Sequence, residues 1–260
     1  MSFGLPESET KLTYGGYLRV RDLTALQQLK SDPPQHDEML FIIIHQAYEL
    51  WFKQIVHELD GIIRRVDQDD VLGASRLLRR CHAIQGVLVE QLSVLETMTP
   101  VEFLSFRDHL MPASGFQSAQ FREIEYTSGL KDERFLAYYD EGTPERQRLE
   151  ARLAGRTLRD AWEAIMRRRG FSADASGAAG VYNSAGEHPD LFQLLEALIE
   201  FDELFTLWRF RHVQMVERVI GGKPGTGGSS GAAYLRGTTG QRIFPELWDA
   251  RTLLGSGGHG

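Results

Sequence analysis

Two long stretches of helical periodicity constrain the fold of this chain more than any other feature. Residues 36–66 and 188–220 carry apolar side chains that recur every three to four positions, the spacing of one face of a helix. Helices of about 30 residues are far longer than the average of about 12 in globular proteins, and they bury their apolar faces best against one another. The sequence therefore predicts an all-α bundle of long helices.

Shorter segments fill in the rest of the predicted bundle. Residues 69–97 form a second helix, a short one follows Pro100, and residues 143–169 form one charged amphipathic helix. The breaker Pro33-Pro34 precedes the first long helix, whose cap we expect at Asp37 or a nearby polar residue.

Two segments break the helical pattern. Residues 170–187 are small and polar, and we expect a flexible connection there. Residues 221–240 hold eight of the 26 glycines, so a regular helix is not expected. No repeat or second domain is evident, so residues 1–260 are expected to form a single domain.

Composition narrows the class of protein. The net charge of −7 does not favour nucleic-acid binding, and no apolar run approaches the roughly 20 residues of a membrane span. A single cysteine, Cys81, excludes an internal disulfide and a cysteine metal cluster. The first 18 residues do not have the order of a signal peptide. We therefore expect a soluble, cytoplasmic protein.

His45 stands in the otherwise apolar stretch LFIIIHQAYELWFKQ, residues 40–54. Burying an imidazole without a partner costs free energy. Two interpretations stay open: a core histidine bonded to a backbone carbonyl, or one wall of a ligand pocket. Phe41 lies four residues before His45 on the same helical face.

His212 stands on an apolar stripe of the second long helix, with Trp208 four residues before it and Met215 three residues after it. It is either a satisfied core histidine or the axial ligand of a haem, which needs an apolar slot with one neutral imidazole. Both long helices could present their histidines to one pocket, one ligating iron and the other opposite it.

Other metal schemes fail on spacing. No Glu-x-x-His occurs, which argues against a carboxylate di-iron bundle, and there is no His-Glu-x-x-His zinc motif.

The glycine-rich stretch KPGTGGSSG, residues 223–231, is not a phosphate loop, because it follows a helix and its lysine precedes proline. It is either a flexible linker or a mobile loop that folds over a ligand. Arg107 lies among Phe103 and Phe106, and it is either a surface ion-pair residue or a carboxylate-binding group.

These stretches, in this order, resemble the tryptophan 2,3-dioxygenase family. The resemblance covers nearly the whole chain and is carried by five strings: LTYGGYL (12–18), HDEMLFIIIHQAYELWFKQ (36–54), FRDHLMPASGFQSAQFR (106–122), LWRFRH (207–212) and GTGGSSG (225–231).

The resemblance implies an all-helical enzyme, usually a homotetramer, that encloses a b-type haem and inserts both atoms of O2 across the indole C2–C3 bond of L-tryptophan to give N-formylkynurenine. It implies a role for each matched residue. His212 is the iron ligand and His45 the distal histidine. Phe41 and Phe103 are pocket walls, and Ser114 and Trp208 lie at the haem. Arg107 and Thr226 bind the amino-acid end of the substrate. Tyr14 and Tyr17, in the arm of residues 1–18, help close a neighbouring subunit's pocket. Residues 221–240 form the active-site loop.

Two other functions stay open. Relatives of this family act on modified tryptophans, and some insert one oxygen atom to give an oxindole. A haem sensor without enzymatic activity is the alternative from a different class, although it would have no need of an amino-acid clamp at Arg107 and Thr226.

Overall fold

The computed structural model describes residues 12–227 and 231–255, and all regular structure in this part of the chain is helical. The α-helices are α1 (Tyr14–Leu18), α2 (Val20–Leu23), α3 (His36–Asp67), α4 (Val71–Leu95), α5 (Pro100–Phe106), α6 (Ala119–Ser128), α7 (Pro144–Ala154), α8 (Leu158–Arg168), α9 (Ala175–Asn183), α10 (Pro189–Ile220), α11 (Ala232–Thr238) and α12 (Pro245–Leu253). Three short 3-10 turns are η1 (Arg107–Leu110), η2 (Gly115–Gln117) and η3 (Glu133–Tyr138). The predicted all-α fold is confirmed.

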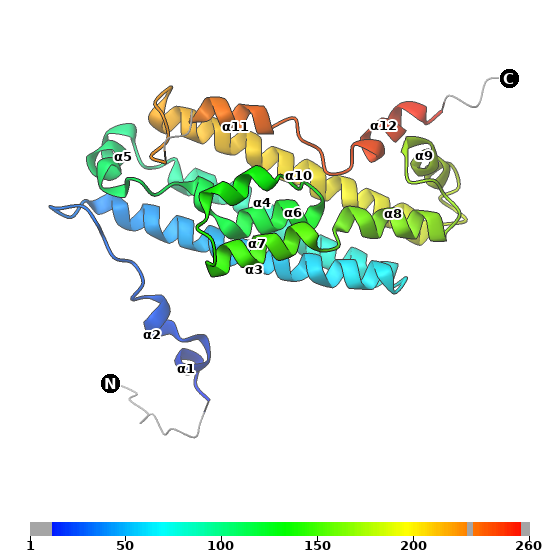
Figure 1. The fold of residues 1–260 in the computed structure, drawn as a ribbon, viewed down its shortest axis with the longest axis horizontal. Helices are drawn as coiled ribbons and strands as arrows, with labels where there is room; N and C mark the ends of the chain where they lie inside the picture. The colour runs from blue at the N-terminus through cyan, green and yellow to red at the C-terminus, as the bar shows by residue number, and fades with distance from the viewer. Residues whose placement is uncertain (1–11, 228–230, 256–260) are drawn as a thin grey trace.

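Three long helices form the centre of the bundle. α4 packs along both α3 and α10, and α6 and α8 cover another side of α3 (Figure 1). Their apolar stripes meet in one continuous core that runs from Ile44 on α3 to Ala250 on α12. α3 and α10 have 32 residues each, close to the lengths of the predicted ranges 36–66 and 188–220. Within the described ranges, no helix combines the length and apolarity needed to cross a membrane.

Local signals explain where several helices begin. The side chains of Asp70 and Ser118 accept hydrogen bonds from backbone N–H groups in the first turns of α4 and α6. Thr99 and Glu102 form a capping box at α5, where proline occupies the first position. The N-cap of α3 is Gln35, a polar residue near Asp37, as the sequence allowed, but its side chain makes no capping hydrogen bond.

The predicted helix over 143–169 is wrong in one respect, because it is two helices. α7 ends at Ala154, and its C-cap Gly155 donates its N–H to the carbonyl of Arg152. Thr157 and Asp160 then form a capping box that starts α8. Amphipathic spacing continues across the break, so periodicity alone did not reveal it.

The expected flexible connection over 170–187 is also wrong. Asp174 caps α9, and Ala178, Ala179 and Val181 are buried where α9 packs against α12. Its small residues serve close packing: a Cβ on Gly177 would lie 1.9 Å from the carbonyl oxygen of Ser172.

The expectation of no regular helix over 221–240 is wrong for its second half, where α11 packs against α10. Residues 221–227 are not helical, and 228–230 lie outside the described residues.

Candidate active site

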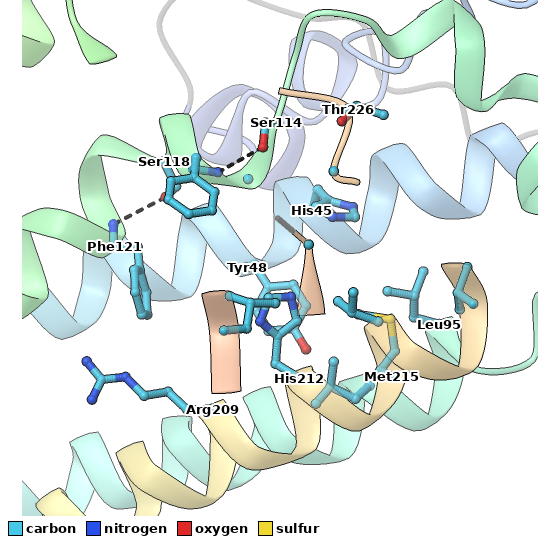
Figure 2. A pocket seen from close by; sticks show the side chains of 18 of the residues that line it. His45, Tyr48, Leu95, Ser114, Ser118, Phe121, Arg209, His212, Met215 and Thr226 are labelled. Atoms are coloured by element: carbon cyan, nitrogen blue, oxygen red, sulfur yellow. Dashed lines mark hydrogen bonds between the residues drawn. The ribbon is translucent and has the colours of Figure 1, made fainter. Parts of the chain in front are cut away.

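One end of the bundle encloses a cavity of about 280 Å³, close to the lower end of the range for small-molecule sites. α3, α5, α6 and α10 supply its walls, and the segment 114–118, the loop at 225–226 and α11 close it. Eight of the predicted site residues line it: Phe41, His45, Phe103, Arg107, Ser114, Trp208, His212 and Thr226. Segments more than 180 residues apart in sequence therefore meet at one site (Figure 2).

His45 presents one ring nitrogen to the cavity. Its Nδ1–H donates a hydrogen bond of 2.7 Å to the carbonyl of Phe41, one turn earlier on α3. Because that carbonyl can only accept, the neutral ring carries its proton on Nδ1, and Nε2 is left as an acceptor. Burial lowers the pKa of His45, so the neutral form is favoured. Both interpretations of His45 therefore hold: Nδ1 is bonded to a backbone carbonyl, and Nε2 faces the pocket.

His212 rises from α10 toward α3 (Figure 2). Its ring stacks on that of Trp208, with centroids 5.1 Å apart, and it has no hydrogen-bond partner among the described residues. Burial, assisted by the nearby His45, lowers the pKa of His212 to about 4. At neutral pH it is therefore an uncharged imidazole with a free lone pair, which is the state that a metal ligand requires.

Aromatic rings make up much of the wall around the two histidines. The Phe41 ring lies 4.0 Å from that of His45 and 5.7 Å from that of Phe103. Tyr48 packs edge-on against Trp208 and donates its hydroxyl proton to the carbonyl of Leu88. Such walls suit a flat, apolar ligand.

Arg107 is tied to the loop opposite it. Its Nη2 donates a bond of 2.5 Å to the carbonyl of Pro224, and no described carboxylate lies within ion-pair distance. The rest of its planar group remains available to an acidic ligand. The surface ion-pair interpretation of Arg107 is therefore not supported.

Thr226 and Gly227 hold the loop against the segment that carries Ser114. The Thr226 hydroxyl donates to the carbonyl of Ala113 over 2.6 Å. A Cβ on Gly227 would lie 2.4 Å from Cβ of Ser114, so the close approach requires glycine. Ser114 itself caps η2 by accepting from the N–H of Phe116.

A cluster of three charged residues, which no sequence pattern indicated, also lines the cavity. Glu125 on α6 accepts from Arg122 on the same helix and, over 2.7 Å, from Arg209 on α10. All three residues are buried, and Nε of Arg122 has no hydrogen-bond partner within residues 12–227 and 231–255. Arg122 does fall within a string that carries the resemblance, but the joining of α6 to α10 is visible only in the fold.

The two predicted arm residues do not reach this cavity. Tyr14 and Tyr17 lie on α1 and are 79% and 71% exposed. α1 and α2 project away from the bundle (Figure 1). Residues 1–11 of the arm lie outside the described residues.

Fold and cavity together define a class: an all-α protein with a small-molecule site that joins two imidazoles to a guanidinium beneath a glycine-rich loop. The family model described as tryptophan 2,3-dioxygenase matches residues 4–169 and 159–254. The chain belongs to this family.

Named relatives cover almost the whole chain. A tryptophan 2,3-dioxygenase from Nocardioides sp. is 49% identical over 98% of each chain. Those from Herpetosiphon aurantiacus and Anaeromyxobacter sp. are 44% and 43% identical, over 94% of this chain and 98% and 96% of theirs.

Proposed function

We propose that this chain is a haem-dependent dioxygenase that inserts both atoms of O2 across the indole C2–C3 bond of L-tryptophan, giving N-formylkynurenine. The observation that carries the proposal is the joining of His212, His45 and Arg107 in one cavity. The whole chain serves as one domain around this site, with residues 221–240 closing it.

The residues of the cavity fit a b-type haem. His212 offers a neutral imidazole that no described residue hydrogen-bonds, set among Trp208, Met215 and Val216. This is the apolar slot with one axial ligand that a haem requires. The Nε–H of buried Arg122, which lacks a partner in the part of the chain that the structure describes, suits an acidic group such as those at the edge of a haem. His212 would hold the iron, and Trp208 and Ser114 would lie against the macrocycle.

A bound haem supplies the binding and activation of O2, and the chain's own residues hold and orient the substrate. Nε2 of His45 accepts a hydrogen bond from the indole N–H. Phe41 and Phe103 pack against the ring. Arg107 pairs with the carboxylate and Thr226 contacts the amino-acid end. The loop at 225–227 excludes water once the substrate is in place.

The product separates this function from its alternatives. After reaction of L-tryptophan under isotopically labelled O2, mass spectrometry should find N-formylkynurenine with two labelled oxygen atoms. One labelled atom in an oxindole would indicate a monooxygenase, and bound haem without turnover would indicate a sensor. The naming of relatives that are 41–49% identical does not favour either alternative.

Replacing His45 by alanine should leave haem content unchanged and reduce activity only in part. A full acid–base group would contribute a factor of about 10²–10⁴, and we expect less because a neutral Nε2 acceptor mainly orients the indole. Haem content by absorbance and turnover of L-tryptophan measure the two effects. Loss of haem from this variant would mean that the roles of the two histidines are exchanged or shared.

Replacing Gly227 by alanine should weaken L-tryptophan binding at unchanged haem content, because the added methyl group would overlap Ser114 and hold the loop off the cavity. Gly222→Ala is the matched control, since a Cβ at Gly222 meets nothing within 4 Å. Equal dissociation constants for Gly227→Ala and the control would contradict this role of the loop.

We further propose that the chain assembles as a homotetramer in the cytoplasm and that Tyr14 and Tyr17 reach a neighbouring subunit's cavity. The arm supports this because its apolar side chains lack cover: Leu12 and Tyr14 are 78% and 79% exposed. The segment between the arm and α3 is anchored to its own subunit, where the buried Glu38 accepts hydrogen bonds from Lys30 and Ser31.

Deleting residues 1–18 should weaken both assembly and L-tryptophan binding, because the exposed arm needs a partner surface to order it. Sedimentation and substrate titration measure the two effects. The double variant Tyr14→Ala, Tyr17→Ala separates them, since it keeps the arm and removes the two rings. A truncated protein that is a fully active monomer would refute the proposal.

A further inference from the structure

A second, much smaller cavity lies behind Trp208, inside the core between α3, α4, α6 and α10. Its volume is about 10 Å³, which is room for a single small molecule. Nine residues line it: Phe52, Ile55, Gln85, Leu88, Phe121, Ile124, Phe201, Phe205 and Trp208.

The chemistry of the lining selects the occupant. Only carbon atoms face the cavity, although Gln85 is among the lining residues. The amide of Gln85 is turned toward the backbone, where its Nε2 donates to the carbonyl of Phe201 over 3.0 Å. Gln85 Oε1 and Trp208 Nε1 are buried without a hydrogen-bond partner in the described part of the chain, but neither atom contributes surface to the cavity. A buried water makes about three hydrogen bonds, which a lining of carbon atoms does not supply, whereas apolar cavities stay dry and bind nonpolar gases.

The small cavity adjoins the large one through side chains alone. Phe52, Phe121 and Trp208 line both cavities. The Phe121 ring lies 5.1 Å from that of Trp208, and the Phe52 ring lies 6.2 Å from it, edge-on. A diatomic molecule could pass when these rings rotate, without displacement of any helix.

We propose that this cavity is a docking site for a small nonpolar gas, and specifically for O2 on its way to the large cavity. The assignment of O2 rests on the proposed dioxygenase function. A site of this kind would raise the probability that O2 lies beside the reaction site when L-tryptophan is already bound and the loop has closed. It would need no polar group and no covalent step.

Xenon under pressure is the direct probe, because it is nonpolar, close in size to O2 and strongly scattering. Crystals of the haem-loaded protein should show a xenon peak between Leu88 and Ile124. Leu88→Phe should abolish the peak by filling the space, and Ile124→Val should strengthen it by removing one methyl group. Ile62→Val is the control, since Ile62 is equally buried but lines neither cavity.

The route is tested by gas rebinding. After flash photolysis of the ferrous carbon monoxide complex, the fast rebinding phase should lose amplitude in Leu88→Phe and keep it in Ile62→Val. Ile124→Met fills the cavity from the opposite wall and replaces Leu88→Phe if that variant does not fold.

Three results would each overturn the proposal: ordered water in the cavity, absence of a xenon peak, or a fast rebinding phase whose amplitude is the same in Leu88→Phe as in wild type. The xenon experiment needs no turnover, so it distinguishes failure of this site from failure of the proposed reaction.

Discussion

Arg107→Leu should collapse the affinity for L-tryptophan and leave the affinity for plain indole almost unchanged. Losing one member of a buried charge pair typically costs about 2–5 kcal/mol. That corresponds to roughly 30-fold to several thousand-fold in the dissociation constant. Indole has no carboxylate, so it loses nothing when the guanidinium is removed. Parallel titrations of the two ligands against wild type and variant measure the difference.

Three further measurements test whether Arg107 acts through the substrate carboxylate. Haem content should stay normal, because Arg107 is not the proposed iron ligand. Arg107→Lys should rescue poorly, since an ammonium lacks the planar fork that binds a carboxylate and also holds the Pro224 carbonyl. Arg79→Leu, an exposed arginine on α4, should change neither affinity. Equal losses for L-tryptophan and indole would show that Arg107 supports the fold instead, and the substrate assignment would lose its main physical argument.

His212→Ala should abolish haem binding, or leave bound haem without its protein ligand and the variant without activity. His212 on α10 is a neutral imidazole with no hydrogen-bond partner among the described residues, and in the proposed function Nε2 of His45 is reserved for the indole N–H. No group of three or more histidine, cysteine, aspartate or glutamate side chains in the described part of the chain is arranged to hold a metal ion, so no cluster could take over. The Soret band and the iron content of the purified variant measure the loss.

The control is His57→Ala, which removes an exposed histidine of α3 and should leave haem content unchanged. Normal haem loading with an unchanged Soret band in His212→Ala would rule out the proposed ligand. Recovery of the band on adding free imidazole to the variant would support it, because imidazole can fill the space left by the side chain.

Periodicity predicted the parts of the fold that obey a simple local rule. α3, α4 and α10 begin and end within a few residues of the ranges expected from the sequence, and α5 begins at Pro100. Apolar spacing of 3.6 residues is a local property of the sequence. In a long helix the pattern repeats over many turns, so single residues that depart from it do not hide it. The predictions were wrong for short helices. The capping box of Thr157 and Asp160 divides 143–169 into two helices, and α9 consists of small residues whose composition is typical of a linker.

The same distinction between local and tertiary information applies to the candidate site. The sequence by itself determined which residues to consider, because His45 and His212 stood out on apolar faces, Arg107 stood out beside two phenylalanines, and the family strings supplied Thr226. It also determined the all-α class. Only the tertiary structure decided that these residues line one cavity, that His45 keeps Nε2 free by bonding Nδ1 to Phe41, and that Arg122, Glu125 and Arg209 lie together at its wall. The physical reason is that helical spacing specifies which face of a helix is buried, whereas the partner of that face depends on how side chains from distant segments pack together.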